Sequence, residues 1–216
     1  MVHKLHSMPN QVARFTNPSE YINVGIILFK DSEKQQILTM KETIKKNLQE
    51  FNMTIAKLGH ATKSSYFVSG GCFASLLQGE IPKDYDIYFY SKELAEPIIN
   101  LFTKDPSYMN EVEDVPDKYR DVAGADGKWI TENAVTLKNH LQLIIKHYGS
   151  PEEIRKTFDF VHCMPYYDLW DDRLYISRRQ YDCCVNKILE INNSANLTTW
   201  REDKFAKRGY KYGNVE

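Results

Sequence analysis

The sequence predicts an α/β protein of the α+β type, in which a mixed sheet is flanked by helices and followed by a helical C-terminal lobe. Residues 85–90 (YDIYFY) and 141–148 (LQLIIKHY) are short, apolar and rich in aromatic or β-branched residues, as buried strands are. Apolar residues at steps of three and four over 41–58 indicate an amphipathic helix. Glycines at 59, 79 and 149 end the predicted elements.

Length and composition are those of a folded protein without a membrane span. The chain has 216 residues and 42% hydrophobic content, enough to build a core. No apolar run approaches the roughly 20 residues of a spanning helix, and residues 1–15 lack a signal-peptide h-region. The four cysteines form no CxxC pair, so we expect reduced thiols and a cytoplasmic location, in the host cytoplasm if a phage encodes the chain.

The N-terminal segment is expected to contain one strand and one long helix. Residues 1–20 are polar and irregular, 21–30 (YINVGIILFK) have strand character, and 31–36 are polar and typical of a turn. A helix is predicted from about residue 41 to 58. Its apolar stripe consists of Met40, Ile44, Leu48, Phe51 and Ile55.

The next segment combines two strands with two helices. A brief strand at 66–68 is followed by a short helix at 72–78 and a second strand at 85–90. Ser91 is a suitable N-cap for another helix. Residues 103–133, which contain prolines, glycines and many acids, are expected to form a long surface loop.

The C-terminal segment starts with two predicted strands at 133–138 and 141–148. Ser150 to Glu153 form a capping box with proline at N1, which predicts a short helix, and 158–162 (FDFVH) are expected to form a further strand. A second capping box at 177–180 opens another helix, and the tail from 198 to 211 is expected to form a last helix. We therefore divide the chain into a catalytic domain at 1–176 and a C-terminal helical lobe at 177–216.

Two aspartates one residue apart form the first half of a candidate site. Side chains at i and i+2 of a strand point to the same face, so Asp84 and Asp86 should lie side by side. Two carboxylates this close repel each other, and a divalent cation removes the conflict. Hard Mg²⁺ prefers carboxylate oxygens and keeps positions for phosphate, which makes Mg²⁺ (or Mn²⁺) the expected cofactor.

A double glycine forms the second half. Gly70 and Gly71 lie where a strand enters a helix, and glycine lets a backbone approach a phosphate closely. Ser69 and Ser75 lie near the expected phosphates, and Lys83 precedes the acids. Ser75 could equally be a small residue packed on the sheet, and Lys83 could face solvent. Together the glycines and acids predict a nucleoside triphosphate (NTP) site.

The segment from Phe67 to Phe89 resembles the nucleotidyltransferase superfamily, which includes DNA polymerase beta and the catalytic head of tRNA CCA-adding enzymes. The family signature is a hydrophobic strand, Gly-Gly or Gly-Ser, about a dozen residues, and an acid–hydrophobe–acid strand. This chain has Gly70-Gly71, twelve residues, and then Asp84-Tyr85-Asp86-Ile87. The resemblance implies a nucleotidyltransferase fold and transfer of a nucleoside monophosphate from an NTP to a hydroxyl.

The resemblance also implies a third carboxylate on a neighbouring strand. Asp159, between two phenylalanines, is the best candidate, with Asp84 and Asp86 as the other metal ligands. Such sites hold two ions about 3.5–4 Å apart. Where the CCA-adding pattern has Arg-Asp after the glycines, this chain has Ala74-Ser75. The later stretch, including residues 141–144, 150–153, 158–160 and 201–210, resembles small nucleotidyltransferase-like proteins of phage genomes.

The acceptor is left open by the sequence. Cations and aromatic residues alternate in the last forty residues, which suits an RNA or triphosphate surface as well as a solvated helix face. We expect an RNA end as the acceptor, with tRNA as one example; the alternatives are nucleotidylation of a protein or small molecule, and a catalytically silent regulator that binds nucleotide or nucleic acid. The cations are Arg178, Arg179, Arg201, Lys204, Lys207, Arg208 and Lys211.

Overall fold

A mixed seven-stranded sheet forms the centre of the molecule. The computed structural model describes residues 12–15, 28–57, 65–108 and 130–213. The strand order is β1-β7-β6-β2-β3-β5-β4, in which β3 and β5 are parallel and the other neighbours are antiparallel. In this order the strands are Val12–Phe15, Arg173–Ser177, Tyr166–Asp168, Tyr66–Ser69, Tyr85–Phe89, Leu141–Tyr148 and Ala134–Thr136. The predicted fold class, a mixed sheet flanked by helices, is confirmed.

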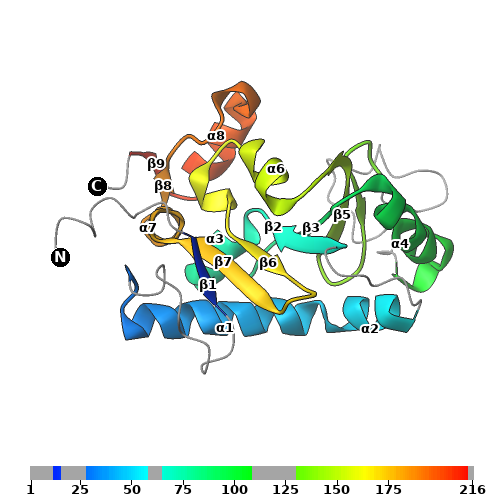
Figure 1. The fold of residues 1–216 in the computed structure, drawn as a ribbon. Coiled ribbons are helices and arrows are strands. Elements are labelled where there is room, and N and C mark those ends of the chain that lie inside the picture. Colours follow the sequence, from blue (N-terminus) through cyan, green and yellow to red (C-terminus); the bar gives the residue numbers. More distant parts are fainter. Residues whose placement is uncertain (1–11, 16–27, 58–64, 109–129, 214–216) are drawn as a thin grey trace.

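One face of the sheet is covered by two consecutive helices, α1 (Asp31–Asn47) and α2 (Gln49–Lys57) (Figure 1). The predicted apolar stripe of five residues is buried, which confirms it. It packs against strand residues such as Val68 and Ile87, which are fully buried in the same cluster. The helix begins earlier than predicted, because Lys30 and Glu33 form an N-terminal cap and Glu33 pairs with Arg178 of α7 (Arg178–Val185). The polar turn predicted at 31–36 is therefore wrong.

The opposite face of the sheet carries the polar side chains discussed below. Phe67 and Tyr88 stack on this face and pack against Ile154 of α6 (Pro151–Lys156). The capping box predicted for α6 is present, with the Ser150 hydroxyl accepting from the Glu153 amide and the Glu153 carboxylate accepting from the Ser150 amide. Helix α4 (Lys92–Lys104), capped by Ser91 as predicted, lies at the β5 end of the sheet (Figure 1).

Several elements near the termini differ from the prediction. Residues 166–168 and 173–177 form β6 and β7, which the sequence did not reveal because both strands are short and polar-aromatic. Strand β1 lies within the segment predicted to be irregular, where it pairs with β7. The strand predicted at 21–30 lies mostly outside the described residues, and its described end at 28–30 is not a strand.

The segment 158–162 is not a strand, so that prediction is wrong. Phe160 makes a single bridge to Ile191, and Val161–Cys163 form a 3-10 helix. The neighbours of β3 in the sheet are β2 and β5, not this segment. Burial of Phe160 beside Phe205 and Tyr210, in a cluster separate from the sheet, explains why an apolar alternation here does not extend the sheet.

The C-terminal part contains two helices and a small sheet. Helix α7 follows the predicted capping box at Ser177, and α8 (Thr199–Ala206) is shorter than the predicted last helix. Strands β8 (Ile188–Leu189) and β9 (Lys211–Tyr212) pair in parallel. The division into domains at residue 176 stays a prediction. No helix within the described ranges is both long enough and apolar enough to cross a membrane.

Candidate functional site

The turn between β2 and the short helix α3 (Cys72–Leu77) places a glycine against an aspartate. Gly70 has φ +98°, a conformation that side chains disfavour, and a Cβ at this position would lie 2.6 Å from Oδ2 of Asp86. Ser69, one residue earlier, is fully buried and donates its hydroxyl to the Pro165 carbonyl at 2.8 Å. Position 70 therefore needs a glycine because Asp86 lies against it. The Ser69 hydrogen bond ties the turn to the residue just before β6.

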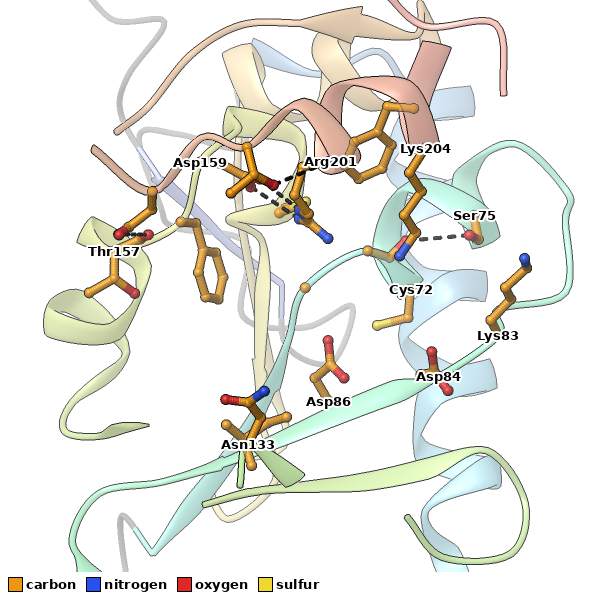
Figure 2. Close-up of a pocket in the computed structure, with 18 of the residues that line it drawn as sticks. Cys72, Ser75, Lys83, Asp84, Asp86, Asn133, Thr157, Asp159, Arg201 and Lys204 are labelled. Atoms are coloured by element: carbon orange, nitrogen blue, oxygen red, sulfur yellow. Dashed lines mark hydrogen bonds and ion pairs between the residues drawn. The ribbon is translucent and has the colours of Figure 1, made fainter. Parts of the chain in front are cut away.

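Strand β3 brings Asp86 to the face of this turn, with Asp84 immediately before the strand. Asp86 is in register with Ser69 of β2 on one side and with Gln142 of β5 on the other. Gln142 donates its side-chain amide to Oδ1 of Asp84 at 3.2 Å. Gly70 thus lies against Asp86, and the Gln142 amide contacts Asp84. Figure 2 shows the two aspartates beside each other.

The electrostatics of this pair favour a cation. Burial, and then the charge of Asp84, raise the pKa of Asp86 from 3.8 to about 7, against smaller opposing effects of Lys204 and Arg201. A divalent ion readily displaces the proton of a carboxyl group whose pKa lies near neutrality, and the proton passes to solvent.

The acids open into a cavity of about 650 Å³ between the sheet and α8. Asp84 and Asp86 lie on the sheet side, and Arg201 and Lys204 of α8 lie across from them (Figure 2). Gly70, Gly71, Ser75 and Lys83 also line the cavity. The structure therefore brings together the sequence-predicted glycines and acids in one concave site, as expected for a small-molecule pocket.

Asp159 also lines this cavity, and its carboxylate is paired with Arg201. Its carboxylate accepts two hydrogen bonds from Arg201, at 2.7 Å to Nε and 3.1 Å to Nη2. Its Oδ1 also accepts from the Phe160 amide at 3.0 Å. Asp159 is buried, so this bidentate pair is shielded from solvent. Asp159 is therefore paired with Arg201 and does not lie on a strand beside β3, while its predicted part in metal binding stays a prediction.

The donor set still suits one kind of metal site. Among the described residues, no group of three or more His, Cys, Asp or Glu side chains could hold a metal ion by itself. Mg²⁺ is commonly bound by one or two carboxylates together with substrate phosphates and water. Asp84 and Asp86, with a pKa near 7 at Asp86 and a cavity in front of them, fit a Mg²⁺ ion that is completed by a phosphorylated ligand.

The remaining predicted residues divide into two groups. Gly71 lies before α3 and lines the cavity, and Lys83 is exposed at its edge. Ser75 is buried, and its hydroxyl accepts from Nη2 of Arg208 at 2.9 Å. Arg208 also pairs with Glu80 at 2.7 Å, so a polar link ties the C-terminal segment to α3.

Sequence reasoning missed Gln142, and it named Arg201 and Lys204 only among seven cations of the last forty residues. Gln142 could have been found, because a parallel strand in register with β3 must present a residue beside Asp86. Arg201 and Lys204 carried a weaker signal: they are one helical turn apart, which puts them on one face of α8. Nothing in the sequence distinguishes them from Lys207, which is exposed.

His162 lies behind the cavity among aromatic rings. It is fully buried, stacks on Phe160 at 5.6 Å and meets Phe205 edge-on at 4.4 Å. Neither ring nitrogen has a hydrogen-bond partner among the described residues. Burial, and then the nearby Arg201, lower the pKa of His162 from 6.5 to about 3. The imidazole is therefore neutral and structural.

The neutral imidazole makes the fold acid-sensitive. The unfolded chain takes up a proton at His162 below about pH 6.5, whereas the folded state does so only near pH 3, so stability falls as pH drops below 6.5. Between pH 7.5 and 5 we expect wild type to lose about 2 kcal/mol more than His162→Phe. Urea unfolding at several pH values measures this difference. His147→Gln, at an exposed histidine, should follow wild type. Parallel curves for wild type and His162→Phe would contradict the assignment.

Comparison with solved structures finds CCA-adding enzymes. A Thermotoga maritima CCA-adding enzyme complexed with tRNA is 16% identical with a TM-score of 0.45, covering 83% of this chain and 40% of that one. A CCA-adding enzyme with CTP is 15% identical with a TM-score of 0.46, covering 87% and 40%. A Bacillus stearothermophilus CCA-adding enzyme with CTP is 15% identical with a TM-score of 0.41, covering 86% and 42%.

The chain spans about two fifths of the length of these enzymes. Because the TM-scores are low, the chemistry of the site is inferred from the residues of this chain alone. No curated protein matches it. A family model described as "Gabija anti-defense 2 family protein" matches residues 28–185, which include Gly70, Asp84, Asp86 and Asp159 and end before α8. The match extends over well over half of the 216 residues, and the chain belongs to the Gabija anti-defense 2 family.

Proposed function

We propose that this chain is a metal-dependent nucleotidyltransferase that transfers a nucleoside monophosphate from an NTP to a hydroxyl group. The observation that carries the proposal is the contact between a left-handed glycine and one of two adjacent carboxylates at the edge of a cavity. The glycine lets the turn approach Asp86 closely, and the cavity in front of the acid pair leaves space for a ligand. A triphosphate with Mg²⁺ suits that space, because its oxygens add to the two carboxylates found there among the described residues.

In the reaction, the acceptor oxygen attacks the α-phosphorus and forms a new phosphoester bond. The bond between that phosphorus and the bridging oxygen breaks, pyrophosphate leaves, and the hydroxyl proton passes to a base or to solvent. Bound Mg²⁺ supplies charge stabilisation for the α-phosphate and the leaving oxygen. Asp84 and Asp86 hold the ion, and the turn at Gly70 and Gly71 brings the triphosphate against them.

We propose an RNA end as the first acceptor to test, tRNA included. Cations of the C-terminal segment and Trp200, 58% exposed at the cavity, are the side chains suited to a nucleic acid. The family description favours a second acceptor, a component of the Gabija defence system. Nucleotidylation of such a protein would place the chain among the factors that counteract that defence. Binding without transfer is the third reading.

One labelling experiment separates these readings. The protein is incubated with each α-³²P-labelled NTP and Mg²⁺ or Mn²⁺, either with pooled RNA or with purified Gabija proteins. Label in RNA supports the first acceptor, and label in a Gabija protein supports the second. Retention of NTP on the chain with no labelled product, in the presence of both acceptors, would refute transfer and leave a binding protein.

A further inference from the structure

The wall of the cavity opposite the acids is cationic. Arg201 and Lys204 lie three residues apart on α8 and line the cavity (Figure 2). Arg208, just beyond this helix, lines it as well. Asp84, Asp86 and Lys204 line one cavity, and the two carboxylates raise the pKa of Lys204 against the larger effect of burial. A ligand between them meets acids on one side and cations on the other.

The three cations differ in how far the protein itself already neutralises them. Arg208 is bound to Glu80, which is 39% exposed, and to Ser75, so it is held at the edge of the cavity. Arg201 is bound to the buried Asp159 through Nε and Nη2.

Lys204 forms no ion pair with an acid of the described residues; its ammonium lies over the rings of Trp200 at 5.3 Å and Phe205 at 5.9 Å. Burial, and then the neighbouring Arg201, lower its pKa. Lys204 is therefore the cation that an anionic ligand would stabilise most.

The Asp159 pair fixes the direction of Arg201. Two parallel hydrogen bonds hold one edge of the planar guanidinium, and the Phe205 ring at 5.0 Å supports its face. Nη1 is not part of the bidentate contact and stays available for an oxygen in the cavity. A guanidinium held in this way meets a phosphate without the loss of side-chain freedom that a mobile arginine would suffer.

We propose that Lys204 and Arg201 bind the β- and γ-phosphates of the nucleotide, and that Asp159 is a positioning residue for Arg201, not a metal ligand. This inference rests on the proposed function, since it assigns the phosphates of one bound NTP to two sides of the cavity, the acid pair and α8. The α-phosphate lies at Asp84 and Asp86, and the two outer phosphates lie against the cationic wall. Pyrophosphate would leave along that wall.

Calorimetry of inorganic triphosphate binding in the presence of Mg²⁺ tests whether the cationic wall binds phosphates, and it does not require nucleotidyl transfer. Lys204→Ala is expected to weaken binding about 10- to 100-fold, because a charge-assisted contact is lost. Arg201→Lys keeps the positive charge but loses the planar guanidinium that makes two hydrogen bonds at once, and it should weaken triphosphate binding about tenfold. Lys207→Ala, a cation of the same segment that is exposed and outside the cavity, is the matched control and should bind as wild type.

Asp159→Asn separates positioning from metal binding. As a positioning residue it should weaken triphosphate binding about five- to tenfold and raise the KM for NTP, with the Mn²⁺ concentration for half-maximal activity unchanged. A metal ligand would instead lower kcat and shift the Mn²⁺ dependence at unchanged triphosphate affinity, and that result overturns the assignment. Thermal unfolding of each variant identifies loss of fold, and Lys204→Ala tests the wall without disturbing the Asp159 pair.

The outcomes also distinguish this inference from the proposed function. Triphosphate binding that depends on Lys204, together with no labelled product, refutes transfer and leaves the cationic wall in place. Transfer with wild-type triphosphate affinity in Lys204→Ala refutes the wall and leaves the enzyme in place. A wild-type chain that fails to bind triphosphate overturns the inference directly.

Discussion

Asp86→Asn is expected to lower nucleotidyl transfer at least about a thousandfold and to leave the fold intact. Metal-ion stabilisation of the reacting phosphate contributes several kcal/mol, and each 1.36 kcal/mol is tenfold in rate. Asp86 is held between Ser69 and Gln142 in the sheet, so asparagine, which has nearly the same shape, occupies the same position. The rate of label incorporation at saturating NTP measures the loss.

The same substitution should stabilise the protein when no metal is present. The pKa of Asp86 is raised from 3.8 to about 7, so the folded state holds the proton over a range where the unfolded chain has released it. The carboxylate therefore destabilises the metal-free fold increasingly as pH rises from about 4 to 7. The side chain keeps some contact with the cavity, and we expect a gain of about 2 kcal/mol at pH 8, or about 5 °C in melting temperature.

Mg²⁺ and NTP provide the complementary measurement. Together they should raise the melting temperature of wild type and have little effect on Asp86→Asn. Asp171→Asn, which removes a partly exposed acid outside the cavity, is the control and should retain activity and the ligand response. Wild-type transfer rates in Asp86→Asn would exclude the acid pair as the catalytic centre.

Local chemistry explains why this half of the site could be read from the sequence. The spacing of Asp84 and Asp86 predicts that both side chains point to the same face of the sheet. The two glycines predict a tight turn, because glycine adopts backbone conformations that other residues disfavour. The capping boxes at Ser150 and Ser177 are equally local, and both helices begin where the boxes predict. In each case the interaction lies within four residues of chain, or within one strand–turn–helix unit.

The other half depends on contacts that no local pattern encodes. Asp159 and Arg201 are 42 residues apart, and the pair forms only because Phe160 is buried with Phe205 in a cluster away from the sheet. The same alternation of acid and phenylalanine would have suited a strand beside β3. Burial of Phe160 away from the sheet favours the observed conformation over a strand beside β3. Asp159, predicted to be the third metal ligand, is paired with Arg201 there.

Gly70→Ala is expected to lower transfer at least about a hundredfold. The new Cβ would lie 2.6 Å from Oδ2 of Asp86, a distance that real Cβ atoms do not show, so the carboxylate must rotate or shift. A displacement of this size moves an oxygen that holds the metal, and misplacement by about 1 Å costs about a hundredfold in an enzyme site. Alanine at φ +98° also strains the backbone by about 1–3 kcal/mol.

Two other glycines of the same region separate the steric effect from the strain. Gly79 has φ +72° but nothing within 4 Å of a Cβ, so Gly79→Ala should lose stability and keep its rate. Gly71 has an ordinary φ of −72° and equally open space, so Gly71→Ala should lose little stability. If Gly70→Ala and Gly79→Ala both lose activity only in proportion to their loss of stability, Gly70 is needed for the backbone conformation of the turn and not for the position of Asp86. A rate loss in Gly70→Ala that Gly79→Ala does not share shows that a side chain at position 70 disturbs the catalytic geometry of Asp86.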